Sequence, residues 1–226
     1  MTMYQPIILH IETSTEVCSV ALSRGKECVC VKESAQGRDH AGKLTVFIAQ
    51  MLDANGISAS KLDAVAVSSG PGSYTGLRIG LSVAKGLCYG ADIPLLSVST
   101  LQSMAMGFAA QSSIAAGALL CPMIDARRME VYTALYDNAG KEVEKVSAKI
   151  ISHQSFESWL DAGHVFFFGN GAEKCSSLIT HQNAIFSEPF SHSAKYMIQK
   201  SLQLYNEKRF EDAAYFEPFY LKNFII

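Results

Sequence analysis

Residues 7–32, IILHIETSTEVCSVALSRGKECVCVK, have a counterpart half a chain later in residues 119–146, LLCPMIDARRMEVYTALYDNAGKEVEKV. Each stretch begins with an apolar run that ends in an acid, Glu12 or Asp125, and an Ala-Leu pair follows nine residues after that acid. A turn and the sequence Gly-Lys-Glu come next in both copies. Short apolar runs between turn signals predict an antiparallel meander in each copy. The sequence therefore predicts a duplicated α/β protein with two related lobes.

Between the two copies, the spacing of the apolar residues changes from that of strands to that of helices. Apolar side chains recur at helical spacing in three segments, residues 39–54, 75–89 and 100–110. Short apolar runs between these segments predict strands at residues 64–67 and 94–98. Helices that cross over between such strands are typical of a mixed α/β sheet.

The duplication sets the expected lobe boundaries. We expect an N-terminal lobe at residues 1–107 and a C-terminal lobe at residues 108–226. A strongly amphipathic helix is predicted at residues 193–207. The sequence leaves open whether this helix packs on the second lobe or returns to the first.

The composition excludes several classes of protein. Of the 226 residues, 49% are hydrophobic and 18% are charged, which excludes a disordered chain. The formal net charge of −2 lacks the basic excess of proteins that grip nucleic acid along its backbone. The first residues lack the features of a signal peptide, and no apolar run reaches the roughly 18 residues of a membrane span. We therefore expect a cytoplasmic protein without membrane contact.

The six cysteines fit that expectation, because thiols stay reduced in the cytoplasm. Cys28 and Cys30 are one residue apart in a predicted strand. Since side chains alternate between the two faces of a sheet, we expect both thiols on the same face. No second pair of cysteines or histidines completes a zinc site with them, so we interpret them as buried, small hydrophobic side chains.

The most distinctive local feature is the Gly-rich stretch from Ser68 to Gly86, SSGPGSYTGLRIGLSVAKG. A Gly-rich loop between a strand and a helix is suited to binding an anion at the helix N-terminus. Thr75 occupies a position at which both the Walker loop and the dinucleotide-binding fingerprint require glycine, so neither motif is present. The alternative is a tight crossover, in which glycine permits positive φ and close approach of the backbone.

The helix within this stretch is apolar on more than one side. One apolar stripe runs from Leu77 to Cys88, and a second runs from Ile79 to Gly86. The sheet of the same lobe covers only one side of a helix, so the second stripe indicates another packing partner. Together with the helix at residues 39–54, this helix offers a surface for docking. Coverage by another part of the same chain is the alternative.

A few residues are suited to binding a nucleotide or a phosphate, although each also has a simpler interpretation. Glu12 and Asp125 lie at matching places in the two lobes, and they suit either flanking a nucleotide or ending a hairpin strand. Gly169 and Gly171 follow a predicted strand and suit either contact with an adenosine or a plain turn. The Arg127–Arg128 pair suits an acidic partner, a phosphate or a solvated turn. The histidines form no HxxxH or HExxH pair, so we expect no helical metal site.

Several segments together resemble a known family. They are ILHIETSTEVCSVAL, SSGPGSYTGLRIGLSVAKGL, PLLSVSTLQSMA, DARRMEVYTALY, FGNGA and EPFYLK, in this order along almost the whole chain. The chain resembles the TsaB (YeaZ) type, the dimerisation subunit of the bacterial machinery that forms threonylcarbamoyladenosine in tRNA. The resemblance implies two duplicated RNase-H-like lobes in an actin/hexokinase/Hsp70-like (ASKHA) fold, which agrees with the internal repeat.

The resemblance also implies that this chain is not the catalyst. A longer catalytic relative transfers the threonylcarbamoyl group to adenosine 37 of tRNA and binds its metal through an HxxxH pair. The two histidine positions fall on Thr100 and Met104 here, and neither side chain replaces an imidazole ligand. We therefore expect a scaffold that activates the catalytic subunit, with no catalytic residue, metal or cofactor of its own.

The implied partners are a TsaD-type catalytic transferase subunit and a TsaE-type ATPase subunit, with a homodimer when the chain is alone. Contact with tRNA is expected to be only indirect. The implied docking residues belong to the two helices and the loop between them: Leu44, Phe47, Ile48, Met51, Gly70, Pro71, Gly72, Tyr74, Gly76, Arg78, Ile79, Val83 and Gly86. The alternatives are an independent ATP-dependent phosphotransferase of the same fold, which uses Glu12 and Asp125, and, less favoured, a metallopeptidase-like protein.

Overall fold

The computed structural model describes residues 4–35 and 39–222 of the chain. These residues form two compact units, each built on its own five-stranded sheet. The first unit extends to Thr100 and also includes Ser193–Tyr220, and the second contains Leu101–His192 with Leu221 and Lys222. No helix in the described part of the chain is both long and apolar enough to cross a membrane.

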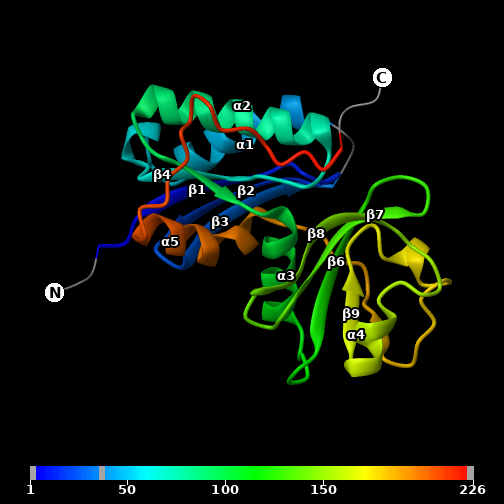
Figure 1. Ribbon diagram of the computed structural model, residues 1–226. Helices are drawn as coiled ribbons and strands as arrows, with labels where there is room; N and C mark the ends of the chain where they lie inside the picture. Colours follow the sequence, from blue (N-terminus) through cyan, green and yellow to red (C-terminus); the bar gives the residue numbers. More distant parts are fainter. Residues whose placement is uncertain (1–3, 36–38, 223–226) are drawn as a thin grey trace. The chain divides into compact units, whose positions relative to one another are not determined.

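The sheet of the first unit is covered by helices on both faces (Figure 1). Its strand order is β3-β2-β1-β4-β5, with an antiparallel meander on one side and two parallel strands on the other. The strands are β1 (Ile7–Glu12), β2 (Cys18–Arg24), β3 (Glu27–Ser34), β4 (Ala64–Ser68) and β5 (Leu95–Val98). One face carries α1 (His40–Ala54), the 3₁₀ helix η1 (Ala59–Lys61) and α2 (Tyr74–Ala91), and the other carries η3 (Ala194–Met197) and α5 (Ile198–Asn206).

The second unit repeats this arrangement. Its strand order is β10-β9-β6-β7-β8, in which β6, β7 and β8 form the meander and β9 and β10 run parallel to β6. The strands are β6 (Leu119–Asp125), β7 (Glu130–Tyr136), β8 (Glu142–Ile150), β9 (Val165–Phe168) and β10 (Ala184–Phe186). Its two faces are covered separately, one by α3 (Thr100–Gln111) and the other by α4 (Glu157–Ala162) and η2 (Glu173–Cys175).

The two sheets correspond strand by strand, from β1 and β6 at the centre to β5 and β10 at the edge. The turn between the second and third strands of each meander also corresponds, because Gly25 and Gly140 both have positive φ there, of 58° and 77°. Most residues with a side chain are strained in that conformation, which explains why both copies carry glycine there. The predicted α/β fold with two duplicated lobes is confirmed.

The units divide at Thr100, whereas the sequence placed the boundary after residue 107. The reason is the apolar side of α3, where Leu101, Met104 and Phe108 pack in the core of the second unit. The segment Ser193–Tyr220 returns to the first unit, which the sequence had left open for its helix. Periodicity identifies the apolar side of a helix, but it does not identify the sheet on which that side packs.

The prediction for Cys28 and Cys30 was wrong. A bulge shifts the pairing of β2 with β3, so that Leu22 lies opposite Cys30 while Ser23 lies opposite Cys28. The two thiols therefore point to opposite faces of the sheet. Neither residue is buried as predicted, because Cys28 is exposed and Cys30 is half-buried. On the α1 side, Asn55 Nδ2 donates a hydrogen bond to the Cys30 sulfur at 3.3 Å. An extra residue in one strand reverses the alternation that the prediction used.

A buried polar cluster holds α5 on the first sheet. The Nε2 atom of His10 lies 2.9 Å from the hydroxyl of Ser23, and its Nδ1 atom lies 3.3 Å from the hydroxyl of Ser201 in α5. All three side chains are buried. Burial lowers the pKa of His10 from 6.5 to about 3, because the charged imidazolium would lose its hydration at this position.

His10 is expected to make the folding stability depend on pH. Between pH 6.5 and about pH 3, the unfolded state binds a proton that the folded state excludes, so stability falls as the pH falls through this range. The expected loss from this group is about 2 kcal/mol at pH 5. Urea denaturation near pH 7.5 and near pH 5 measures it, with His10→Asn as the variant that lacks the titrating group. Equal losses in both proteins would contradict the assignment to His10.

Candidate docking surface

Helix α1 begins where the sequence predicts and buries one side against the sheet. Asp39 caps the helix, because its carboxylate accepts a hydrogen bond from the backbone N–H of Gly42 at 3.0 Å. Three of the expected docking residues, Leu44, Ile48 and Met51, are buried in the core of the first unit. Their side chains therefore hold α1 on the sheet and do not form its outer surface.

Helix α2 is also buried on one side, against the end of β1. Gly76 and Gly80 lie so close to Thr13 that a Cβ atom on either glycine would overlap its carbonyl or hydroxyl oxygen. The hydroxyl of Thr13 also donates a hydrogen bond to the carbonyl of Gly76 at 2.8 Å. Gly76 was expected at the docking surface, but the structure places it against its own unit, where close packing of two backbone segments requires glycine.

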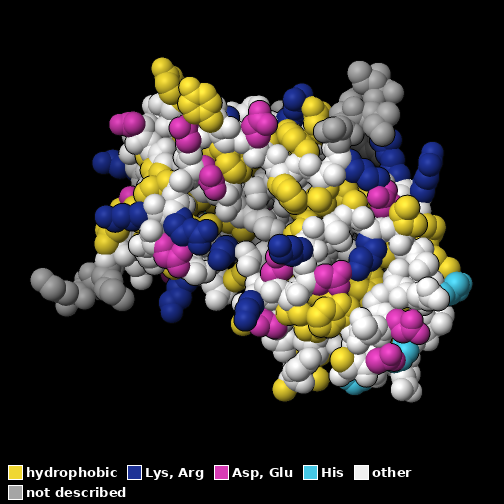
Figure 2. Space-filling model, viewed as in Figure 1, with side chains coloured by type: hydrophobic (Ala, Val, Ile, Leu, Met, Phe, Trp, Pro, Cys, Tyr) yellow, Lys and Arg dark blue, Asp and Glu magenta, His cyan; other side chains and the backbone are white. Residues whose placement is uncertain are grey.

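The outer sides of α1 and α2, which lie next to one another, hold the other expected residues of these helices. Figure 2 shows hydrophobic side chains at its upper edge, where Figure 1 draws α2. The exposed fraction of Val46, which was not among the expected docking residues, is 47%. We define the docking face by the partly or fully exposed residues Val46, Phe47, Ile79, Val83 and Gly86.

Gly86 differs from the buried glycines of the same helix. A Cβ atom at this position would meet only open space among the described residues. Glycine in a helix interior costs about 1 kcal/mol relative to alanine. No contact within the described chain accounts for that cost, and the same is true of Gly90 near the end of the helix.

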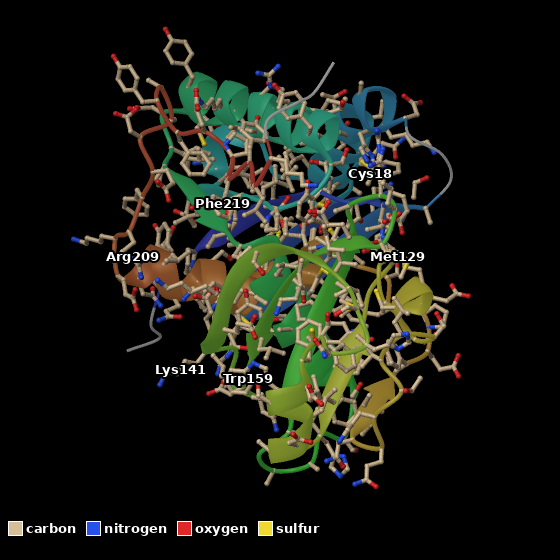
Figure 3. The ribbon with its side chains drawn as sticks, turned by 45° about the vertical axis from the view of Figure 1, so that its right-hand side comes forward. Cys18, Met129, Lys141, Trp159, Arg209 and Phe219 are labelled. Carbon is tan, nitrogen blue, oxygen red and sulfur yellow. The ribbon has the colours of Figure 1, made fainter. Side chains whose placement is uncertain are left out.

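The C-terminal segment, residues 215–220, runs beside α2 in Figure 1 and holds the loop before this helix in place. We call these contacts the clamp. The backbone N–H of Phe219, labelled in Figure 3, donates to the carbonyl of Ser69 at 2.7 Å. Gly70 has a φ of 102°, and a Cβ atom there would lie 2.7 Å from the Phe219 carbonyl oxygen. Sequence reasoning missed this clamp, for which the aromatic-rich segment 215–220 was the available signal.

Two expected docking residues take part in the same clamp. The rings of Tyr74 and Tyr220 pack with their centroids 4.8 Å apart, and the Arg78 guanidinium lies 4.6 Å from the centroid of the Tyr74 ring. A hydrogen bond to Tyr220 raises the pKa of Arg78 above its ordinary value. The start of α2 is therefore held from outside by the C-terminal segment.

The inner side of the loop is filled by the protein's own backbone. Pro71 is buried, and Gly72 packs directly against Ser14. The carbonyl of Ser14 also accepts a hydrogen bond from the N–H of Ser73 at 2.6 Å. These contacts favour the tight crossover over an anion site in this loop.

Three of the four residues considered for a nucleotide come together in the second unit. A Cβ atom on Gly169 would overlap the carbonyl oxygen of Met123, and one on Gly171 would lie 2.9 Å from the backbone nitrogen of Asp125. The Asp125 carboxylate forms an ion pair with Lys174. Close packing therefore accounts for the two glycines, and the ion pair occupies the carboxylate.

Glu12, the fourth of these residues, belongs to the first unit and is fully buried at the end of β1. Its carboxylate accepts a hydrogen bond from the backbone N–H of Ser14 at 2.6 Å. Glu12 thus supports the turn between β1 and β2.

Over nearly its whole length, the chain is similar in sequence to bacterial proteins. Residues 31–215 match the family model described as TsaD: tRNA N6-adenosine threonylcarbamoyltransferase. The chain is 32% identical over 229 residues to the tRNA threonylcarbamoyladenosine biosynthesis protein TsaB of Haemophilus influenzae, covering 96% of this chain and 93% of that protein. It is also 32% identical to TsaB of Escherichia coli, with 96% and 94% covered. The chain belongs to the TsaB family.

Solved structures share the fold of this TsaB-family chain. YeaZ from Pseudomonas aeruginosa gives a TM-score of 0.82 at 26% identity, over 96% of this chain and 100% of that one. A structure from the same organism, described as an uncharacterized protein with similarity to peptidase YeaZ, gives 0.83 with the same coverage. The resemblance to TsaB and YeaZ proteins and the duplicated ASKHA-like fold are therefore confirmed.

In this TsaB-family chain, Thr100 and Met104 both lie in α3. Thr100 begins α3 and is buried, and Met104 packs in the core of the second unit. Within residues 4–35 and 39–222, no three His, Cys, Asp or Glu side chains are grouped as a metal ion requires.

Proposed function

We propose that this chain is a non-catalytic subunit in the formation of threonylcarbamoyladenosine in tRNA, which docks on a TsaD-type catalytic subunit and activates it. The observation that carries the proposal is the docking face, where two adjacent helices expose apolar side chains around Gly86, whose Cβ position is open among the described residues. Two helices presented side by side pack well against two helices of a partner. In isolation, the same face is available to a second copy of the chain.

The non-catalytic role is supported by the structural contacts of three residues at positions considered for metal or nucleotide binding. Met104 is a core residue, and Asp125 is held in an ion pair with Lys174. Glu12 is used by the turn between β1 and β2. We include a TsaE-type ATPase subunit as a further member of the complex, following the family resemblance.

A cytoplasmic location is part of the same proposal. Burial raises the pKa of both Cys18 and Cys88 to about 11, so these thiols stay protonated near neutral pH. Protonated thiols are poor nucleophiles, and the two side chains contribute to the hydrophobic core of the first unit. Such cysteines suit a reducing compartment, in which no disulfide is required.

The test is the mass of the chain in solution, measured by light scattering during size exclusion. We expect a homodimer for the chain alone and a mixed complex when the catalytic relative from the same organism is added. A chain that ignores this relative would contradict the proposal. A saturable ATP site in the isolated chain, found by titration, would favour the phosphotransferase alternative instead.

A further inference from the structure

The turn between β6 and β7 contains two consecutive arginines in an uncommon conformation. Arg127 and Arg128 have φ values of 69° and 50°, in the left-handed region that residues with side chains seldom adopt. Asparagine and glycine are the usual residues where two adjacent positions need positive φ, because they adopt it at lower cost. Backbone strain of this kind is typical of binding and catalytic sites.

The neighbouring residues hold this turn rigidly. Lys174 of η2 donates hydrogen bonds to the carbonyl oxygens of Arg128 and Glu130, both at 2.7 Å. The same ammonium group forms an ion pair with Asp125, whose carboxylate accepts a hydrogen bond from the backbone N–H of Arg127 at 2.9 Å. The turn is therefore fixed from several sides, which is the condition under which strained residues persist.

The arginine pair has no anionic partner among the residues that the structure describes. Both side chains are exposed, and neither makes an ion pair or a hydrogen bond with a residue that the structure describes. The two nearby carboxylates are each bound to a lysine, Asp125 to Lys174 and Glu130 to Lys222. The cluster formed by these residues has a net charge of +2, from four basic groups (Arg127, Arg128, Lys174 and Lys222) and two acidic ones (Asp125 and Glu130). The charge is local, since the chain as a whole carries −2.

The guanidinium groups of Arg127 and Arg128 are suited to one class of ligand. A guanidinium group binds a phosphate through two parallel hydrogen bonds, and it keeps its charge at any physiological pH. Two such groups on one rigid turn suit neighbouring phosphates of a nucleic-acid backbone. Figure 3 labels Met129, the next residue of this turn.

We propose that Arg127 and Arg128 bind phosphate groups of the tRNA backbone and so help to position tRNA on the complex. The inference rests on the proposed function, which brings tRNA to this complex. It also revises the expectation that the chain reaches tRNA only indirectly. Contacts of this kind set the position of a nucleic acid and carry no base specificity.

The experiment uses the full chain assembled with its catalytic and ATPase partners. The test variant combines Arg127→Asn with Arg128→Gly, which removes both charges and supplies residues suited to positive φ. The matched control combines Lys141→Ala with Lys145→Ala, two exposed cations at and beyond the turn at the other end of β7 (Lys141 is labelled in Figure 3). Fluorescence anisotropy measures the affinity for tRNA over a range of salt concentrations.

The arginine variant is expected to bind tRNA about 10- to 100-fold more weakly near physiological salt, and its logarithmic salt slope is expected to fall by about 1.4 to 1.8. The lysine control is expected to keep the wild-type affinity. An arginine variant with wild-type tRNA affinity overturns the inference. Loss of ATP or ADP binding without a change in tRNA affinity also overturns it, because the phosphate is then that of a nucleotide.

Light scattering of the same samples separates this inference from the proposed function. A complex that forms normally but shows no effect of the arginine variant overturns only the tRNA contact. A complex that fails to form with the wild-type chain overturns the proposed function, and the inference with it.

Discussion

Val83→Glu is expected to abolish binding to the TsaD-type subunit while the first unit stays folded. Val83 is half-buried at the edge of the core, so in the free chain the new carboxylate can turn towards water. In the complex that carboxylate would be buried without a partner, which costs about 3 to 5 kcal/mol, or roughly 100-fold to several thousand-fold in affinity. Isothermal titration calorimetry with the catalytic subunit measures the loss.

The matched control is Leu202→Glu in α5. Leu202 is also half-buried in the first unit, but α5 lies on the opposite face of the sheet from α1 and α2. This variant is expected to keep the affinity of the wild type, and circular dichroism shows whether both variants are folded. If Val83→Glu binds normally, or if Leu202→Glu loses binding to the same extent, the docking face is misplaced.

The second large effect is expected from Gly76→Ala, which should destabilise the first unit by about 3 kcal/mol or more. The added Cβ atom would overlap the carbonyl oxygen of Thr13, which is backbone and cannot rotate away. The hydrogen bond from the Thr13 hydroxyl to the Gly76 carbonyl holds the two segments at this distance. Separating them would break that bond and open the packing of α2 on β1. The free energy of unfolding in urea measures the effect.

Gly86→Ala provides the comparison within the same helix. Its Cβ atom would meet open space, so the isolated chain is expected to gain about 0.5 to 1 kcal/mol of stability. Binding to the catalytic subunit is expected to weaken, because the partner then meets a methyl group where it meets only backbone in the wild type. A similar loss of stability in both variants would show that the contact with Thr13 does not explain the glycine at position 76.

The duplicated fold could be predicted because its signals are local. The acids at Glu12 and Asp125, the Ala-Leu pairs and the turns before Gly-Lys-Glu all recur within short stretches of each copy. Each signal depends on neighbours in the same hairpin, where the pairing of consecutive strands follows from the turn. The order of strands in both sheets then agrees with that pattern.

The features that escaped prediction depend on contacts between distant parts of the chain. The amphipathic pattern of α3 identifies an apolar side, but both sheets were candidates to receive it. Gly76 belongs to a helix whose inner and outer sides both carry small residues, and only the position of Thr13 separates them. The clamp joins Phe219 to Ser69, which are far apart in sequence, so no local periodicity reveals it.

The return of Ser193–Tyr220 to the first unit has a consequence for how the protein is made. The N-terminus of a chain leaves the ribosome first, and domains generally fold as units during synthesis. Here the first unit lacks α5 and its clamp until the segment 193–220 has left the exit tunnel. Tyr220 therefore reaches Tyr74 and the start of α2 only after the second unit has been translated. A nascent chain that has not yet released residues 193–220 therefore has an α2 without its C-terminal contacts.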